Sequence, residues 1–210
     1  MTTRHTFKTP QEEFWAGEFG TEYIDRNNDI QSSASNLNFF SKALTRAGRI
    51  SSCLEFGANI GLNLKALQSL YPYIQLKAIE INPVAAIRLA VLIGKENVFE
   101  GSILEYPVTE KVDLTLIRGV LIHINPEMLT SVYEKLYQAS SRFILIGEYY
   151  NPSPVSINYR GHADRLFKRD FAGEILEKYP DLRLVDYGFV YHRDPAFPID
   201  DVTWFLMEKR

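Results

Sequence analysis

Short apolar runs alternate with longer amphipathic stretches along most of this chain, and this alternation constrains its fold more than any other feature. Residues 51–56 are interpreted as a strand that ends at a glycine, and residues 62–71 carry leucines at helical spacing. Pro83 stands where the next helical stretch begins, which is a favoured position for proline. Strand and helix alternation of this kind predicts a parallel sheet with helices on both faces.

The same pattern sets the expected elements. We expect strands at residues 51–56, 74–79, 97–99, 112–117, 142–146, 182–191 and 201–208, and helices at 36–47, 62–71, 83–92, 126–139 and 168–179. No helix separates the last two strands, so we expect an antiparallel last strand in a seven-stranded, mostly parallel sheet. Residues 149–166 carry two prolines and few apolar side chains, and we expect a long loop there.

Length and composition limit the kinds of protein that this chain can be. Its 210 residues, 46% of them hydrophobic, suit one domain with a sizeable core, in which we expect 1–48 to be a helical cap and 49–210 the core. A net charge of -3 argues against a protein that wraps nucleic acid, and a single cysteine, Cys53, excludes an internal disulfide. There is no apolar targeting segment, membrane-length run or clustered metal ligands, so we expect a cytoplasmic protein with no membrane partner and no metal.

Glycines and carboxylates mark the ends of the first two expected strands. In an open parallel sheet, ligands bind beyond these carboxyl ends. The loop from Glu55 to Gly61 lacks the lysine of a phosphate-binding loop and the full dinucleotide glycine spacing, and the Glu55 carboxylate suits a positively charged amine. Glu80, at the end of the second strand, is suited to ribose hydroxyls. The alternative is that the glycines only form a turn and that Glu80 is a solvated strand end.

These segments, with Gly101-Ser102-Ile103 after the third strand and Arg118-Gly119 after the fourth, resemble the class I S-adenosylmethionine-dependent methyltransferases. The resemblance implies a single Rossmann-like domain with S-adenosylmethionine as its cofactor. It implies that the loop from Glu55 to Gly61 holds the methionine end, Glu80 the ribose, and Ser102 with Ile103 the adenine. Many members carry an acidic residue where this chain has Ser102. The implied cofactor set is Glu55, Gly57, Ala58, Asn59, Gly61, Glu80, Ile81, Gly101, Ser102, Ile103, Arg118 and Gly119.

A narrower resemblance covers nearly the whole chain. It is carried by EFWAGEFG at 13–20, YIDRN at 23–27, RGVLIHI at 118–124, EYYNPSP at 148–154, YRGH at 159–162 and LFKRDFAGE at 166–174. These segments are similar to the pseudaminic acid biosynthesis-associated methylase family. The resemblance implies a role in carbohydrate biosynthesis, in a nonulosonic or surface-polysaccharide pathway, with a sugar-related or nucleotide-sugar acceptor.

The expected loop and its surroundings supply candidates for binding this acceptor. Residues 159–169 hold four basic side chains and one acid, which reverses the charge of the whole chain. Guanidinium groups bind carboxylates and phosphates in a bidentate manner, so we expect a small anionic acceptor. The candidates are Tyr149, Tyr150, Tyr159, Arg160, His162, Arg169 and Arg193. Alternatively, some of the basic residues only begin a solvated helix.

Two residues are candidates for the general base. His123 follows the fourth strand and has an ordinary pKa near neutrality, whereas Glu148 ends the fifth. A structural role for His123 at a helix start is an equal alternative. Trp15 and Tyr23 belong to an aromatic group near the N-terminus that either packs in the core or closes over the cofactor.

The function predicted from these residues is methyl transfer to oxygen or nitrogen by a monomer or homodimer. Two rival functions remain open at this point. A nicotinamide-dependent oxidoreductase would also use a ribose-binding carboxylate such as Glu80, and a binding module would hold S-adenosylmethionine without transferring its methyl group.

Overall fold

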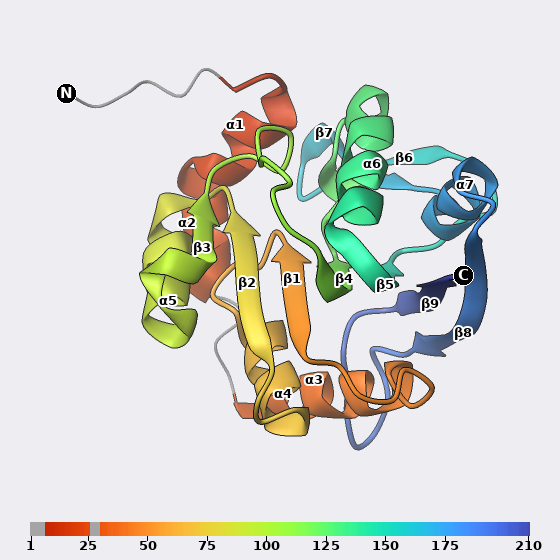
Figure 1. Ribbon diagram of the computed structural model, residues 1–210. Coiled ribbons are helices and arrows are strands. Elements are labelled where there is room, and N and C mark those ends of the chain that lie inside the picture. Colours follow the sequence, from red (N-terminus) through yellow and green to blue (C-terminus); the bar gives the residue numbers. More distant parts are fainter. Residues whose placement is uncertain (1–6, 26–29) are drawn as a thin grey trace.

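A computed structural model of the chain describes residues 7–25 and 30–210. Its main sheet has seven strands in the order β3-β2-β1-β4-β5-β9-β8 (Figure 1). They are β1 (Ser52–Phe56), β2 (Gln75–Glu80), β3 (Val98–Glu100), β4 (Val112–Arg118), β5 (Ser140–Glu148), β8 (Leu182–Val190) and β9 (Val202–Lys209).

Strands β1 to β5 run parallel, and β9 pairs antiparallel with both β5 and β8. This arrangement confirms the predicted Rossmann-like sheet, mostly parallel with an antiparallel last strand. The central strand β4 is buried over most of its length, as expected of a parallel strand covered by helices on both faces.

Helices and short 3-10 turns connect these strands and cover the sheet. They are α1 (Pro10–Ala16), α2 (Glu18–Asp25), α3 (Ile30–Ala43), α4 (Leu62–Leu70), α5 (Pro83–Ile93), η1 (Lys95–Asn97), η2 (Leu121–His123), η3 (Pro126–Met128), α6 (Leu129–Ala139) and α7 (Phe171–Lys178). Side chains of α3, α4 and α5 pack into one core cluster, and those of α6 and α7 into a second cluster. The two clusters hold alternate residues of β5, so they lie on opposite faces of the sheet.

The N-terminal segment divides between the core and the carboxyl edge of the sheet. Phe39 and Phe40 of α3 are fully buried in the same cluster as β1 and β4 side chains. Helix α1 lies instead above the strand ends, whereas α2 lies beside α5 (Figure 1). Residues 1–6 and 26–29 of the expected cap, including part of the YIDRN segment, lie outside the described residues. The division into a cap and a core stays a prediction.

The stretch that we expected to be a loop forms a hairpin instead. Strands β6 (Val155–Tyr159) and β7 (His162–Lys168) pair antiparallel in a separate two-stranded sheet. The helix expected from residue 168 begins at Phe171, because Lys168 ends β7 and the Asp170 side chain caps α7 by accepting a hydrogen bond from the Gly173 amide (2.8 Å).

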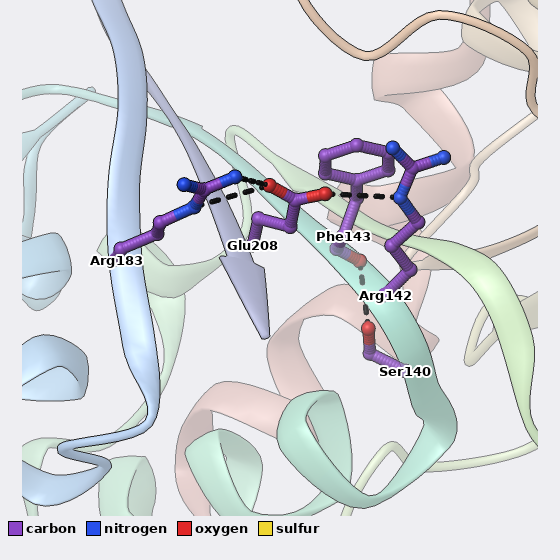
Figure 2. Close-up of polar contacts among 5 residues, drawn as sticks. All are labelled: Ser140, Arg142, Phe143, Arg183 and Glu208. Carbon is purple, nitrogen blue, oxygen red and sulfur yellow. Dashed lines mark hydrogen bonds and ion pairs between the residues drawn. The ribbon is translucent and has the colours of Figure 1, made fainter. Parts of the chain in front are cut away.

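Charged side chains join the last three strands of the sheet. Glu208 of β9 accepts hydrogen bonds from Arg142 Nε of β5 (3.0 Å) and Arg183 Nε of β8 (3.1 Å), as Figure 2 shows. The Arg142 guanidinium also lies over the Phe143 ring, 4.3 Å from its centroid. These contacts lie away from the candidate site described below and support the register of β9.

Candidate functional site

One cavity of about 510 Å³ crosses the carboxyl ends of the parallel strands. Its walls come from the loops after β1, β2, β3 and β4, from Tyr149 after β5, and from α1 and α2. A volume of this size lies within the range of small-molecule and cofactor sites.

The loop after β1 turns sharply because two glycines adopt left-handed backbone angles. Gly57 has φ of 75° and Gly61 has φ of 82°. A Cβ atom on Gly57 would lie 2.7 Å from the Val120 side chain, so only glycine fits there. The Gly57 amide donates to the Ile79 carbonyl oxygen (2.9 Å), which holds the loop against β2 and leaves Gly57, Ala58 and Asn59 facing the cavity.

The Glu80 carboxylate organises the middle of the cavity wall. It is buried, and it accepts hydrogen bonds from the amides of Asn59 (2.6 Å) and Asn82 (2.7 Å). Burial raises the pKa of Glu80 above its usual range, while these amide hydrogen bonds act in the opposite direction. Ile81 also lines the cavity beside it.

The Asn82 side chain joins this edge to the N-terminal helices. Its Oδ1 caps α5 by accepting from the amides of Val84 and Ala85, and its Nδ2 donates to the Trp15 carbonyl oxygen (3.2 Å) and Thr21 Oγ1 (3.1 Å). We did not identify Asn82 from the sequence, although asparagine before proline at a helix start is a capping signal.

Glu55 lies behind the cavity wall. Its carboxylate is fully buried and accepts a hydrogen bond from Asn63 Nδ2 (2.6 Å), and Asn63 Oδ1 accepts one from the Arg118 guanidinium (2.7 Å). Arg118 also donates to Asn36 Oδ1 (2.7 Å). Burial raises the pKa of Glu55 to about 8, although Asn63 and Arg118 favour its charged form.

The cavity end near β3 is lined by Gly101, Ser102 and Ile103 and also by Glu12 of α1. The Ser102 hydroxyl donates to Glu12 Oε1 and accepts a hydrogen bond from the Leu104 amide (3.0 Å). A carboxylate from the N-terminal segment therefore lies beside Ser102, and the sequence analysis missed it.

Aromatic side chains surround the opposite end of the cavity. The His123 ring lies 4.6 Å from the Trp15 ring and 5.0 Å from the Tyr159 ring between centroids, and Tyr23 packs on Trp15 at 5.3 Å. His123 Nδ1 lies 2.5 Å from the Arg165 carbonyl oxygen, so it is the protonated nitrogen and Nε2 is left as an acceptor. Burial lowers the pKa of His123 to about 4.

Glu148 lies outside the cavity lining and binds the backbone after β4. It is buried and accepts hydrogen bonds from the amides of Val120 (3.0 Å), Leu121 (2.9 Å) and Ile122 (3.4 Å). Burial raises its pKa to about 7. The loop that Glu148 holds carries His123.

The structure separates the predicted site residues into two groups. Those that line the cavity are Trp15, Tyr23, Gly57, Ala58, Asn59, Glu80, Ile81, Gly101, Ser102, Ile103, Arg118, Gly119, His123, Tyr149, Tyr159 and Arg160. Those outside its lining are Glu55, Gly61, Glu148, Tyr150, His162, Arg169 and Arg193.

The predicted acceptor residues outside the lining have other surroundings. Tyr150 is 42% exposed beside Phe205, and the His162 ring packs on Phe14 at 5.0 Å between centroids. Arg169 forms an ion pair with Glu174 (2.5 Å), and Arg193 is exposed. The lining contains further polar residues that we did not identify from the sequence, among them Asn36, Asn63 and Asp200. No motif marks them, because distant parts of the chain bring them together.

The described residues contain neither a metal-ligand cluster nor a membrane-spanning helix. Residues 7–25 and 30–210 contain no cluster of three or more His, Cys, Asp or Glu side chains placed to hold a metal ion. Within the same residues, no helix combines the length and the apolar character needed to cross a membrane.

No family model and no curated protein match the sequence, whereas many solved structures match the fold. The 1,6-didemethyltoxoflavin-N1-methyltransferase of Burkholderia thailandensis, solved with S-adenosylhomocysteine, is 18% identical with a TM-score of 0.68, over 91% of this chain and 85% of the other. Magnesium protoporphyrin IX methyltransferase of Synechocystis, also with S-adenosylhomocysteine, is 10% identical with a TM-score of 0.70, over 95% and 98%.

Mitomycin 7-O-methyltransferase is 12% identical with a TM-score of 0.66, over 96% of this chain and 61% of the longer enzyme. The narrower resemblance to the pseudaminic acid-associated family stays a prediction, because no family model matches. Likeness at these identities concerns the fold, and it shows that the chain has the Rossmann-like fold of the class I methyltransferases.

Proposed function

We propose that this protein is an S-adenosylmethionine-dependent methyltransferase that methylates a hydroxyl group of a small, anionic, sugar-related acceptor. The observation that carries the proposal is the single cavity that joins the carboxylate of Glu80 to the buried imidazole of His123. Neighbours of the same fold were solved with S-adenosylhomocysteine, which supports the same cofactor here.

Buried polar atoms in the cavity suit such a ligand. Asn59 Oδ1 and Trp15 Nε1 are buried without a hydrogen-bond partner in the described part of the chain, and both residues line the cavity. A buried acceptor and a buried donor without partners are costly, so both side chains would gain hydrogen bonds by turning toward a polar ligand in the cavity. Glu55 Oε2 is also buried without a partner, and the positive charge of a bound sulfonium ligand would favour the charged form of this carboxyl group.

Different residues of the cavity would bind different parts of S-adenosylmethionine. Glu80 would accept hydrogen bonds from ribose hydroxyls, and the glycine loop after β1 would border the methionine part, with Asn63 linking Glu55 to Arg118 behind that loop. When bound, S-adenosylmethionine supplies a methyl group on a positively charged sulfur, which is the chemistry that the protein itself lacks.

His123 is the proposed general base. Its Nδ1 proton is held by the Arg165 carbonyl oxygen, so Nε2 keeps its lone pair and can take a proton from an acceptor hydroxyl. Glu148 is proposed to position His123 through the three amides that it binds, since its carboxylate lies outside the cavity lining.

The positive charge of Arg160 in the cavity lining is the reason for proposing an anionic acceptor. It is the basic residue of the 159–169 segment that lines the cavity, and its backbone has a left-handed φ of 52°. Trp15, Tyr23, Tyr149 and Tyr159 supply flat apolar surfaces beside it, which suit the faces of a sugar ring.

Binding experiments test this proposal before the acceptor is identified. Calorimetry should detect S-adenosylhomocysteine binding and no binding of nicotinamide dinucleotides. Once an acceptor is known, Arg160→Ala should raise the KM for that acceptor and leave the affinity for S-adenosylhomocysteine unchanged. Arg193→Ala, at an exposed arginine outside the cavity lining, is the matched control and should change neither value. A dinucleotide preference, or equal effects of the two arginine variants, would contradict the proposal.

A further inference from the structure

The end of the cavity near β3 contains a carboxylate that comes from another part of the chain. Glu12 belongs to the first turn of α1, yet it is only 8% exposed and lines the cavity with Ser102. The two residues are 90 positions apart in the sequence, and the Ser102 hydroxyl donates to Glu12 Oε1. A buried carboxylate in a cavity wall needs hydrogen-bond donors, and a ligand can supply the remaining ones.

The two oxygens of this carboxylate are used unequally. Oε2 accepts hydrogen bonds from the Thr9 amide (2.7 Å) and the Thr9 hydroxyl (3.1 Å), which form the capping box of α1. Among the described residues, Oε1 accepts only the hydrogen bond from Ser102. A carboxylate oxygen has two acceptor positions, so Oε1 retains one for a ligand donor.

The order of strands indicates which ligand group lies there. The sheet order places β3 beside β2 and on the side away from β1 and β4. If the Glu80 carboxylate at the end of β2 binds the ribose, then the base lies at the end of β3, against Gly101, Ser102 and Glu12. The exocyclic amino group of adenine is a donor of two hydrogen bonds, whereas a carboxylate only accepts.

We propose that Glu12 is the residue that selects adenine, by accepting a hydrogen bond from its amino group on Oε1. This inference rests on the proposed S-adenosylmethionine site. Glu12 would then act both as a specificity residue and as part of the α1 cap. Occupation of the β3 end of the cavity would thereby stabilise the helix that carries Trp15 to the opposite end, beside His123.

Paired ligands that differ only in the base test this proposal. S-adenosylhomocysteine presents an amino donor at the purine 6-position, and S-inosylhomocysteine presents a carbonyl acceptor there. The wild-type protein should bind the adenosyl ligand about 10- to 100-fold more tightly, the scale of a hydrogen bond to a charged group. In Glu12→Gln the amide can donate to the inosyl carbonyl, so this ratio should narrow to within about 3-fold.

Control variants separate recognition from helix capping. Glu13→Gln changes the neighbouring exposed carboxylate of α1 and should leave the ratio unchanged. Thr9→Ala weakens the cap but keeps the Glu12 carboxylate, so it should lower both affinities without changing their ratio. If Glu12→Gln does not fold, Glu12→Asp, which withdraws the carboxylate by one methylene, should weaken the adenosyl ligand more than the inosyl ligand.

The outcomes are distinct for this inference and for the proposed function. An unchanged ratio in Glu12→Gln or Glu12→Asp, with S-adenosylhomocysteine still bound by the wild type, would overturn the role of Glu12 and leave the cofactor assignment standing. Absence of S-adenosylhomocysteine binding in the wild type would overturn both.

Discussion

Three glutamates lie at or next to the carboxyl ends of β1, β2 and β5, and their hydrogen-bond partners give them different roles. Glu80 binds two loop amides and faces the cavity, Glu55 contacts Asn63 behind the wall, and Glu148 holds three amides of the loop that carries His123. A carboxylate at a strand end is therefore a useful sign of the site, but its role depends on which groups reach it.

The ribose role of Glu80 can be tested with a conservative variant. Glu80→Gln keeps an acceptor oxygen and loses the charge, so S-adenosylhomocysteine should bind about 10- to 100-fold more weakly in calorimetry, the scale of hydrogen bonds to a charged group. Glu100, its exposed neighbour in the register of β3, provides the matched control as Glu100→Gln. Equal affinity of the Glu80 variant and the wild type would remove Glu80 from the cofactor site.

Burial of His123 makes a prediction about the stability of the protein at different pH values. Its pKa is lowered to about 4 in the folded protein, against about 6.5 unfolded. Between pH 6.5 and pH 4 the unfolded chain therefore binds more protons than the folded protein. The free energy of unfolding should fall by about 3 kcal/mol as the pH is lowered from 6.5 to 4. Urea unfolding of wild type and His123→Gln should diverge over this window, with the variant losing less stability.

The same burial makes a prediction about catalysis. With an acceptor, His123→Ala should lower kcat by ~10²–10⁴-fold and leave S-adenosylhomocysteine affinity unchanged. In the pH–rate profile of the wild type, kcat should fall on the acid side only near pH 4 to 5, because the buried imidazole stays neutral above its pKa of about 4. A limb near pH 6.5, or a loss of only a few-fold in His123→Ala, would argue against His123 as the base.

At the scale of elements, α1 and the β6–β7 hairpin pack against each other beside the cavity. Gln11 Nε2 donates to the Asp164 carbonyl oxygen (3.0 Å), the Phe14 ring packs on His162, and the Arg165 guanidinium lies over Phe14, 5.3 Å from the ring centroid. Hydrogen bonds of these two short elements depend on this mutual packing, since both lie outside the main sheet.

Removal of one aromatic ring should therefore loosen both elements together. In Phe14→Ala, amide hydrogen exchange should become faster in residues 10–16 and 155–168, with little change in the main sheet. Tyr73, which is 94% exposed, provides the control as Tyr73→Ala. Faster exchange in α1 with an unchanged hairpin would show that the two elements are independent.

The elements themselves were predictable where the sequence pattern is strong. Strand β5 contains the unbroken apolar run from Phe143 to Ile146, and α5 begins at the proline expected to start it. The hairpin was missed, because β6 is almost wholly exposed and the α1 side chains that contact β7 are more than a hundred residues away in the sequence. The alternation of apolar and polar side chains in β6 is typical of a strand, but the two prolines before it favoured a loop.

At the scale of the molecule, the strand order determines which parts of the site the sequence reveals. Residues at strand ends, such as Gly57, Glu80 and Arg118, were predicted because the fold gathers all carboxyl ends at one edge. Glu12 and Asp200 were not, because their place depends on how the N-terminal helices and the segment before β9 pack on that edge. The fold is thus more fully predictable than the site that it builds.

The measurement that tests the central claim most directly is acceptor-dependent methyl transfer. The purified protein, S-adenosylmethionine and a pool of hydroxylated sugar acids or nucleotide sugars are incubated, and both products are followed by mass spectrometry. We predict that S-adenosylhomocysteine forms only when acceptor is present, with the mass of one methyl group added to an anionic acceptor, and that Arg160→Ala loses this reaction at low acceptor concentration. Tight binding of S-adenosylmethionine with no methyl transfer to any acceptor in the pool would contradict the proposed methyltransferase activity. That result would favour a protein that only binds S-adenosylmethionine.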